Sequence, residues 1–208
     1  MTAMRSLLGS CFRSITHAST ISSRKTNCTL ISRIGFKLIS RSRQISLYSK
    51  SQFSIIEWKS KLARIAVFTH FTKYFTLGKI IGKGKYAHVN LALSIDSQQE
   101  YAIKSLDKNK IILNQKTFDS LFNEIDVLRE IDHRGIVKLF FIYESEEKIH
   151  LVLEYLKGGE LFEHIQNCVT FTEKEAIEIM RNILEAIAYI HSQGIIHRDI
   201  KPENIIMV

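Results

Sequence analysis

Residues 195–204 read I-I-H-R-D-I-K-P-E-N, and this stretch decides how the rest of the chain is interpreted. A carboxylate (Asp199), an ammonium (Lys201) and an amide (Asn204) stand at near-alternate positions, and Pro202, the only proline, fixes the backbone between them. A group that accepts a hydroxyl proton, a neighbouring cation and a metal-ligating amide suit phosphoryl transfer, because that reaction needs positioning and charge neutralisation. A solvated charged turn is the alternative for this stretch taken alone.

A glycine-bearing turn stands upstream, in I-G-K-G-K-Y-A-H-V at residues 81–89. Gly82 and Gly84 lie between predicted strands, and their backbone N–H groups can approach a phosphate closely. Ala87 occupies the third position of the pattern G-x-G-x-x-G, and we expect it to stiffen the loop. Hairpin turns often contain such glycines, so the turn is informative only together with the other motifs.

A second pair of charges lies between these two motifs. Lys104 ends the strand-like Y-A-I-K, and Glu124 follows twenty residues later in N-E-I-D-V-L. Glu124 precedes apolar positions on a helix face that should pack on the sheet, so its carboxylate can orient the lysine toward a phosphate. Taken singly, each residue is a surface charge.

The segment L-V-L-E-Y-L-K-G-G-E-L-F, residues 151–162, reads as a buried strand that runs into a Gly-Gly break. A linker of this kind between two lobes offers backbone N–H and C=O groups to a planar base. Glu160 begins the helix that follows, where a carboxylate is also favoured by the helix dipole. Helix capping is therefore the alternative role for Glu160.

The apolar pattern from Phe75 onward is regular. It predicts strands at 75–81, 89–93, 101–106, 136–143 and 148–155, and helices at 118–131, 160–166 and 172–191. The pattern Thr172-x-x-Glu175 indicates a capping box at the start of the last helix.

In order, these motifs resemble the eukaryotic protein kinase fold: G-x-G-x-x-A-x-V, A-I-K, a helix glutamate, H-R-G-I-V-K-L, G-G-E-L-F and H-R-D-I-K-P-E-N. The resemblance covers residues 75–208, about two thirds of the chain and about half of a kinase domain. It implies an α+β fold: an N-lobe (75–153) with an antiparallel sheet and one main helix, a hinge (154–158) and an incomplete helical C-lobe (159–208).

The resemblance also implies a role for each matched residue, with ATP and Mg²⁺ as cofactors. Asp199 is the catalytic base, Lys201 steadies the γ-phosphate and Asn204 ligates Mg²⁺. Lys104 contacts the α- and β-phosphates and pairs with Glu124. The residues implied to bind ATP are Ile81, Gly82, Lys83, Gly84, Val89, Ala102, Lys104, Leu153, Glu154, Leu156, Glu160 and Ile206.

The same resemblance narrows the substrate. Lys201, two residues after Asp199, is typical of Ser/Thr kinases rather than tyrosine kinases. Glu160 and Glu203 match acidic positions that receive an upstream arginine in basophilic kinases, and with G-G-E-L-F they resemble the calcium/calmodulin-dependent or cAMP-dependent groups. We therefore expect transfer of the γ-phosphate of ATP to Ser/Thr hydroxyls of proteins, at sites with basic residues upstream.

The D-F-G segment, the activation loop, A-P-E and the later C-lobe helices of such a kinase would lie beyond Val208. Because the D-F-G aspartate ligates Mg²⁺, we expect this chain alone to be inactive. We also expect the apolar residues of helix 172–191 to be partly exposed. The alternative is a non-catalytic nucleotide- or protein-binding module of kinase ancestry.

The residues before position 75 carry other signals. Residues 1–28 are basic and rich in Ser and Thr, which predicts a disordered leader or a targeting signal. Residues 29–66 read as two strands and an amphipathic helix and resemble the C-terminal end of a pleckstrin-homology (PH) domain, where a mid-helix Trp like Trp58 packs into the core. An arbitrary strand–strand–helix linker is the alternative. Residues 67–74 read as a linker.

The charge is unevenly distributed. Residues 1–56 hold nine Lys/Arg and no Asp or Glu, whereas residues 57–208 hold 20 basic and 21 acidic residues. The main body is therefore no general polyanion binder, and we expect no nucleic-acid partner and only weak membrane-surface contact through the N-terminus.

The apolar runs and the cysteine spacing indicate the expected cellular compartment. No apolar run reaches the roughly 18 residues of a membrane-spanning helix. The cysteines (Cys11, Cys28 and Cys168) are widely spaced, which fits a reducing compartment. We expect a cytoplasmic location, with the membrane surface or an organelle as alternatives.

Overall fold

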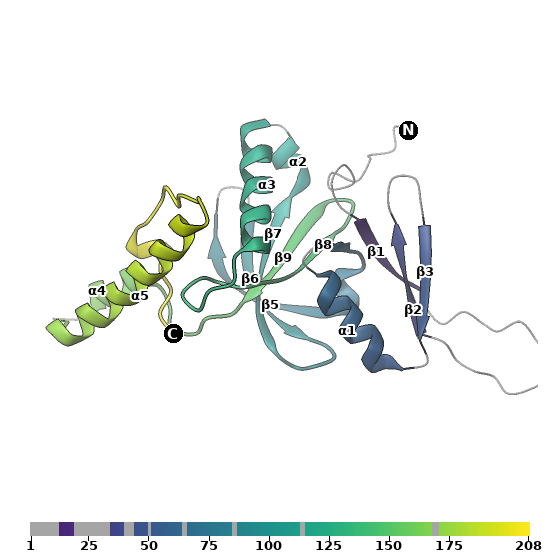
Figure 1. The fold of residues 1–208 in the computed structure, drawn as a ribbon, viewed down its shortest axis with the longest axis horizontal. Coiled ribbons are helices and arrows are strands. Elements are labelled where there is room, and N and C mark those ends of the chain that lie inside the picture. The colour runs from purple at the N-terminus through teal and green to yellow at the C-terminus, as the bar shows by residue number, and fades with distance from the viewer. Residues whose placement is uncertain are drawn as a thin grey trace, which may run out of the picture. The chain divides into compact units, whose positions relative to one another are not determined.

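The computed structural model describes residues 13–18, 34–39, 44–49, 51–63, 66–84, 87–112, 115–167 and 171–208. The chain divides into two compact units, and Figure 1 traces their elements along the sequence. The first unit comprises residues 1–120 and 139–153 and contains a β-sheet, whereas the second comprises residues 121–138 and 154–208 and is mostly helical. The chain passes from the first unit to the second for the last time between Leu153 and Glu154.

A mixed nine-stranded sheet organises the first unit, in the order β3-β2-β1-β4-β8-β9-β7-β6-β5. Strands β7 and β9 lie inside the sheet and carry consecutive buried residues, because a strand covered on both faces needs apolar side chains at successive positions. The strands are β1 (Arg13–Ala18), β2 (Ile34–Ile39), β3 (Gln44–Ser49), β4 (Ala66–Phe68), β5 (Phe75–Lys83), β6 (Ala87–Ser94), β7 (Glu100–Asp107), β8 (Leu139–Glu144) and β9 (Lys148–Glu154).

The predicted strands of the kinase-like region are confirmed as β5 to β9, and the pairs β5/β6, β6/β7 and β8/β9 are antiparallel, as expected. The sheet differs from the expectation in extending beyond residue 75 toward the N-terminus. Strand β4 pairs in parallel with β8 through Phe68 and Tyr143, and β1 pairs in parallel with β4. The sheet therefore ends at β3 on one side and at β5 on the other.

The N-terminal residues also correct two expectations. Residues 13–18, predicted to belong to a disordered leader, form β1 because β2 and β4 satisfy its backbone groups on both sides. The other residues of that leader lie outside the described part of the chain. Residues 67–74, predicted to be a linker, supply Phe68 and Phe71 to the core, because their aromatic side chains are more stable buried.

The strand–strand–helix predicted within residues 29–66 is present as β2, β3 and α1 (Gln52–Leu62). Helix α1 packs on β2 and β3, with Ile55 buried and Leu62 against the core. The resemblance to a PH domain predicted a buried Trp58, and this is wrong, since the side chain is 52 % exposed. Position 58 is three residues after Ile55 and four before Leu62, so its spacing predicts the packed face, yet the Trp58 side chain is half exposed.

Aromatic side chains fill the core where β4, β8 and β5 meet. The Phe68 and Tyr143 ring centroids lie 5.5 Å apart, and Phe71 stacks on Phe75 at 5.4 Å. Tyr143 meets Phe75 edge to face at 5.7 Å. These contacts join the segment before residue 75 to the kinase-like sheet through side chains as well as backbone pairing.

Among the described residues of the same unit, polar side chains are buried in two places, the Lys108–Glu144 pair and His150. Lys108 begins helix α2 (Lys108–Ile112), and its ammonium contacts the Glu144 carboxylate at 2.6 Å and the Ser145 carbonyl at 2.6 Å. His150 on β9 stacks on Phe71 at 4.3 Å, and its Nδ1 lies 2.8 Å from the Ser105 hydroxyl. Both groups have partners, as buried polar groups require.

Three helices account for most of the second unit: α3 (Gln115–Glu130), which begins in the first unit, α4 (Leu161–Asn167) and α5 (Glu173–Ser192). All three were predicted. The capping box is confirmed, because the Glu175 N–H donates to the Thr172 hydroxyl and the Thr172 N–H donates to the Glu175 carboxylate. In the part of the chain that the structure describes, no helix is long and apolar enough to span a membrane.

Candidate functional site

The glycine turn and two neighbouring strands align several of the predicted nucleotide-binding residues. Gly82 on β5 stands opposite Val89 on β6, and Val89 stands opposite Lys104 on β7. Opposite residues of paired strands share a face, so these three positions form one row across the sheet. The turn is closed by the Gly84 N–H, which donates to the Ala87 carbonyl at 2.8 Å. The predicted residues Ile81 and Lys83 flank Gly82 on β5.

The remaining predicted residues of the first unit lie on β7 and β9. Ala102 is two residues from Lys104 and therefore shares its face of β7; Ala102 is buried and Lys104 half-buried. Leu153 lies near the end of β9 opposite Leu139. Glu124 lies on α3 in the second unit, so the predicted pairing of Lys104 with Glu124 remains a prediction.

The linker at residues 154–158 is anchored at its first residue. The Glu154 N–H donates to the Lys138 carbonyl at 2.9 Å, and the Lys138 N–H donates to the Glu154 carboxylate at 3.3 Å. The Glu154 side chain is thus turned toward Lys138, and the predicted role of the Glu154 backbone in binding a base remains a prediction. Leu156 follows in the linker and is half-buried.

The Gly-Gly break has a steric reason that the sequence did not reveal. The Gly158 N–H donates to the Met207 carbonyl at 3.1 Å, and the Met207 N–H donates to the Gly159 carbonyl at 2.9 Å. A Cβ on Gly158 would collide with the Met207 carbonyl, and Gly159 has a φ of +77°, which favours glycine. Both glycines are therefore needed for the segment near the C-terminus to pair with the linker.

This pairing continues into helix α4. Glu160 forms a bridge with Ile206, and the Leu161 N–H donates to the Ile205 carbonyl at 2.8 Å. Two of the predicted ATP-binding residues, Glu160 and Ile206, are therefore neighbours although 46 positions separate them in the sequence. The Glu160 side chain is exposed at the start of the helix.

The H-R-D-I-K-P-E-N stretch brings its three predicted functional groups together. The Lys201 ammonium lies 3.0 Å from Asp199 Oδ2, and Asn204 Nδ2 donates to the same oxygen at 2.9 Å. Asn204 Nδ2 also donates to the Asp199 backbone carbonyl at 2.8 Å. The cluster is exposed, so it is accessible to a ligand.

Local backbone geometry explains how so short a stretch folds back on itself. Arg198 has a φ of +67°, a left-handed conformation that turns the chain before Asp199. Pro202 then begins the short 3₁₀ helix η2 (Pro202–Asn204), where its fixed φ is favourable and its missing N–H costs nothing. This single turn returns Asn204 to Asp199 five positions earlier.

The neighbouring groups perturb the Asp199 carboxyl. The hydrogen bond from Lys201, followed by that from Asn204, lowers the pKa of Asp199 below its ordinary value. The negatively charged form is favoured because both contacts stabilise the carboxylate.

Helix α5 is fastened to the loop at residues 131–138 of the same unit. The His133 and Tyr189 rings stack with centroids 4.9 Å apart, and the Asp132 N–H donates to the Tyr189 hydroxyl at 3.2 Å. Arg134 pairs with Glu185. The H-R-G-I-V-K-L motif therefore has a positioning role that its sequence alone did not specify.

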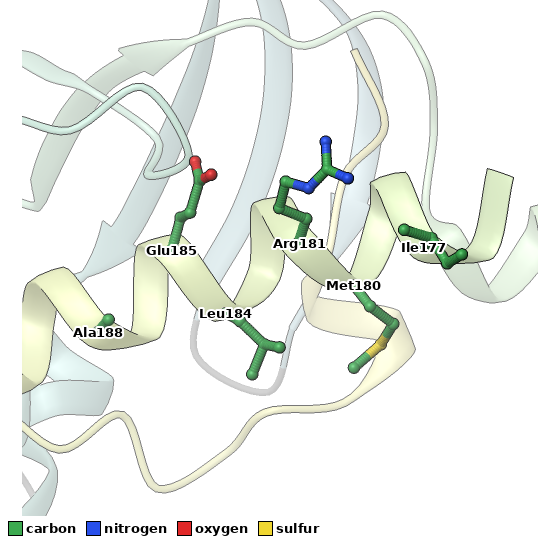
Figure 2. Close-up of a pocket in the computed structure, with 6 residues that line it drawn as sticks. All are labelled: Ile177, Met180, Arg181, Leu184, Glu185 and Ala188. Carbon is green, nitrogen blue, oxygen red and sulfur yellow. The ribbon is translucent and has the colours of Figure 1, made fainter. Parts of the chain in front are cut away.

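The remaining face of α5 carries an open apolar pocket (Figure 2). Figure 2 shows Met180 and Leu184 directed away from Arg181 and Glu185. Ile177, Met180 and Leu184 are each about half exposed, which confirms the expectation of partial exposure, whereas Ile190 of the same helix is buried.

Metal-ligand chemistry in the described residues is sparse. No group of three or more His, Cys, Asp or Glu side chains placed to hold a metal ion occurs among the residues that the structure describes. The Asn204 amide nitrogen is engaged by Asp199, which leaves the amide oxygen for another partner. An amide oxygen is a suitable ligand for Mg²⁺ but by itself forms only part of a site.

Comparison with known proteins identifies the family to which the sequence belongs. Residues 75–208 match the model of the protein kinase domain. The chain is 44% identical over 137 residues to calcium-dependent protein kinase 5 of Plasmodium berghei (strain Anka), across 65% of this chain and 24% of that protein. It is 41% identical over 133 residues to calcium/calmodulin-dependent protein kinase type 1 of Macrobrachium nipponense, across 64% of this chain and 38% of that protein.

A third relative is a probable serine/threonine-protein kinase, fhkC, of Dictyostelium discoideum, 37% identical over 133 residues across 64% of this chain and 22% of that protein. The chain thus spans less than two fifths of the length of each of these relatives. The ordered motifs, the N-lobe sheet, the compact H-R-D-I-K-P-E-N loop and these matches agree. This chain belongs to the protein kinase family, and residues 75–208 form part of a eukaryotic Ser/Thr kinase domain.

Proposed function

We propose that this kinase domain transfers the γ-phosphate of ATP to serine or threonine hydroxyls of proteins, with Asp199 receiving the substrate hydroxyl. The observation that carries the proposal is that Lys201 and Asn204 both contact the same oxygen, Asp199 Oδ2. This arrangement fixes the carboxylate through Oδ2, and we propose that the other oxygen, Oδ1, accepts the hydrogen bond of the hydroxyl.

The lowered pKa of Asp199 indicates how its carboxylate acts on the substrate hydroxyl. Because the pKa of Asp199 is lowered by Lys201 and Asn204, the carboxylate is ionised at neutral pH and is a weak base. It orients the hydroxyl by accepting its hydrogen bond and takes the proton as the oxygen becomes bonded to phosphorus. Positioning therefore contributes more than basicity, in agreement with the loose transition state of phosphoryl transfer.

ATP and Mg²⁺, which protein kinase domains use in general, fit the residues present. A Cβ on Gly82 would make only an ordinary contact with Val89, 3.4 Å from its Cβ, so the support from Gly82 is its bare backbone beside the row of Gly82, Val89 and Lys104. We propose that Gly82, Gly84 and Lys104 hold the phosphates, and that Asn204 offers its amide oxygen to Mg²⁺. When bound, Mg²⁺ neutralises charge on the transferring phosphate.

The substrate preference follows from two exposed carboxylates of the second unit. Glu160 pairs by its backbone with Ile206, three residues after Glu203, so both acids belong to the same part of that unit. We propose that they receive an arginine a few residues before the phosphoacceptor. Charge-assisted hydrogen bonds from a guanidinium to carboxylates are strong enough to select such peptides.

The first experiment separates catalysis by the domain from catalysis by the isolated chain. We propose that the 208-residue polypeptide has negligible turnover, because residues 1–208 contain no D-F-G aspartate to hold Mg²⁺. A chimaera that continues after Val208 with the C-lobe of a relative, from its D-F-G motif onward, should phosphorylate a Ser/Thr peptide. Asp199→Asn should abolish this activity, and Asp126→Asn, an exposed aspartate on α3, should leave it unchanged.

The results also distinguish the alternative. Robust peptide phosphorylation by the 208-residue polypeptide, lost in Asp199→Asn, would show that residues 1–208 suffice. A folded chimaera that binds ATP without transferring phosphate would instead favour a non-catalytic nucleotide-binding module.

The second experiment addresses the substrate. The chimaera should prefer a peptide with arginine three residues before the serine over its alanine counterpart. Glu203→Gln should reduce that preference and leave the rate with the alanine peptide unchanged. Equal rates with both peptides would remove the proposed arginine preference and leave the Ser/Thr assignment intact.

A further inference from the structure

Charge divides this protein at the start of its kinase domain. Residues 1–74 contain 13 Lys/Arg and one acidic residue, Glu57, whereas residues 75–208 contain 16 Lys/Arg and 20 Asp/Glu. The net charges are +12 and −4. Opposite charge on adjoining parts of one chain favours an anionic partner for the first part and repels that partner from the second.

Helix α1 and strand β3 each expose large apolar side chains in this basic region. Phe53 is 75 % exposed and Trp58 52 % exposed, and Ile45 on the neighbouring strand β3 is 53 % exposed. We name Phe53, Trp58 and Ile45 the apolar tips. Ile55 and Leu62 of the same helix pack inward, so the tips are not needed for the packing of α1 on the sheet.

The packing of α1 keeps Phe53 and Trp58 exposed. The Lys59 ammonium donates to the Tyr74 hydroxyl at 3.0 Å and lies 4.1 Å from the Tyr74 ring centroid, which ties the middle of α1 to the last residue before the kinase domain. Burial of Ile55 fixes the rotation of the helix about its axis. Phe53 and Trp58 therefore cannot turn inward without loss of both contacts.

The charges on the helix do not oppose an anionic partner. Glu57, the one acidic residue of the basic region, pairs with Lys61 at 2.8 Å across one helical turn. Lys61 therefore neutralises the local charge between Phe53 and Trp58. The remaining basic residues of the region provide long-range attraction without opposition.

We propose that residues 1–74 dock the kinase on an anionic lipid bilayer, with the apolar tips entering the headgroup region. Trp and Phe are favoured at membrane interfaces, and basic residues are attracted to anionic lipids. A bilayer is favoured over nucleic acid because the aliphatic Ile45 gains from an apolar medium, whereas nucleic acid offers phosphates to cations and base faces to aromatic rings. Residues 75–208 carry a net charge of −4 and gain nothing from contact with the same surface.

The experiment uses Trp58, the only tryptophan of the chain, as a reporter at the proposed contact. The full 208-residue chain is mixed with vesicles of phosphatidylcholine, with and without phosphatidylserine. We expect co-sedimentation and a blue shift of Trp58 emission with the anionic vesicles only, and quenching of Trp58 by brominated lipid. Added salt should weaken the binding.

Paired variants assign the effect to α1. Phe53→Ser should weaken vesicle binding at least about tenfold, since a buried phenyl ring is worth that much or more. Phe162→Ser, at an exposed phenylalanine on α4, should leave binding unchanged. Lys61→Glu should weaken binding and Lys174→Glu on α5 should not, and circular dichroism verifies the fold of each variant.

Four results would overturn the proposal. They are no change in Trp58 emission with anionic vesicles, equal binding to neutral vesicles, unchanged binding by folded Phe53→Ser, or a Trp58 response to transfer RNA in place of vesicles. The last result would identify nucleic acid as the partner of the basic region.

Discussion

The two units each contain a Lys–carboxylate pair at nearly the same distance. In the sheet unit, Lys108 and Glu144 lie 2.6 Å apart with side chains only 7 % exposed, whereas in the helical unit Lys201 and Asp199 lie 3.0 Å apart with 46 % and 62 % exposed. Burial makes the first pair a structural element, because neither charge has water as a substitute partner. Because the second pair is exposed, its loss should change the free energy of unfolding little, and its side chains are accessible to a reactant.

The largest effect is expected from breaking the buried pair. Lys108→Met leaves Glu144 as a buried charge without its cation and should lower the free energy of unfolding of the sheet unit by about 3–4 kcal/mol. Urea unfolding followed by Trp58 fluorescence measures this change in the free energy of unfolding, because Trp58 lies in the same unit.

Two controls accompany this measurement. Lys108→Met/Glu144→Leu should recover more than half of the loss, since both charges are then absent. Lys110→Met, at an exposed lysine on the same helix, should change stability by less than about 0.5 kcal/mol. A loss that is additive in the double variant would contradict the pairing.

The second effect is acid sensitivity of the sheet unit. Burial, aided by the Lys148 charge, lowers the pKa of His150 from 6.5 to about 4. Between these values the unfolded chain binds more protons than the folded one, so this contribution to stability is present above pH 6.5 and is lost as the pH falls through 4. The loss should reach about 3 kcal/mol, because each pKa unit is worth about 1.4 kcal/mol.

Urea midpoints measured by Trp58 fluorescence from pH 7 to pH 4 test this expectation. His150→Phe, which retains an aromatic ring against Phe71, should flatten the profile in that window. Parallel profiles for the two proteins would show that another group causes the acid sensitivity.

The third effect concerns helix α5, where a local interaction is exposed. Thr172→Ala removes the hydroxyl that caps the Glu175 N–H and should destabilise the helix by about 1 kcal/mol. Faster hydrogen exchange of amides in the first turns of α5 would report this loss. Thr172→Ser retains the hydroxyl and should exchange as the wild type does.

The smallest effect on stability should come from the exposed pair. Lys201→Met should change unfolding very little, yet the pKa of Asp199 should rise toward its ordinary value, since Lys201 is the main cause of its depression. A carbon-detected NMR titration of the Asp199 carboxyl measures that change. Lys201→Arg keeps the cation and should preserve the lowered pKa; an unchanged pKa in Lys201→Met would mean that Asn204 alone sustains it.

Local patterns in the sequence predicted much of the architecture. Strands β5 to β9 and helices α3 to α5 follow from apolar periodicity, and the α5 start follows from Thr172 and Glu175. Strand β4 and helix α2 were missed because each is too short for a periodic pattern. Strand β1 was missed because its stability depends on β2 and β4, which are distant in sequence.

For the candidate site, residue types and their order in the sequence determined the kinase family and named Asp199, Lys201 and Asn204, since that chemistry depends on local spacing. Only the tertiary structure decided which polar pair is buried, why Gly158 must be glycine beside Met207, and that Trp58 faces outward. These features depend on contacts between residues far apart in the chain. A pattern of neighbouring residues does not contain such contacts, because burial and close backbone approach are properties of the packed molecule.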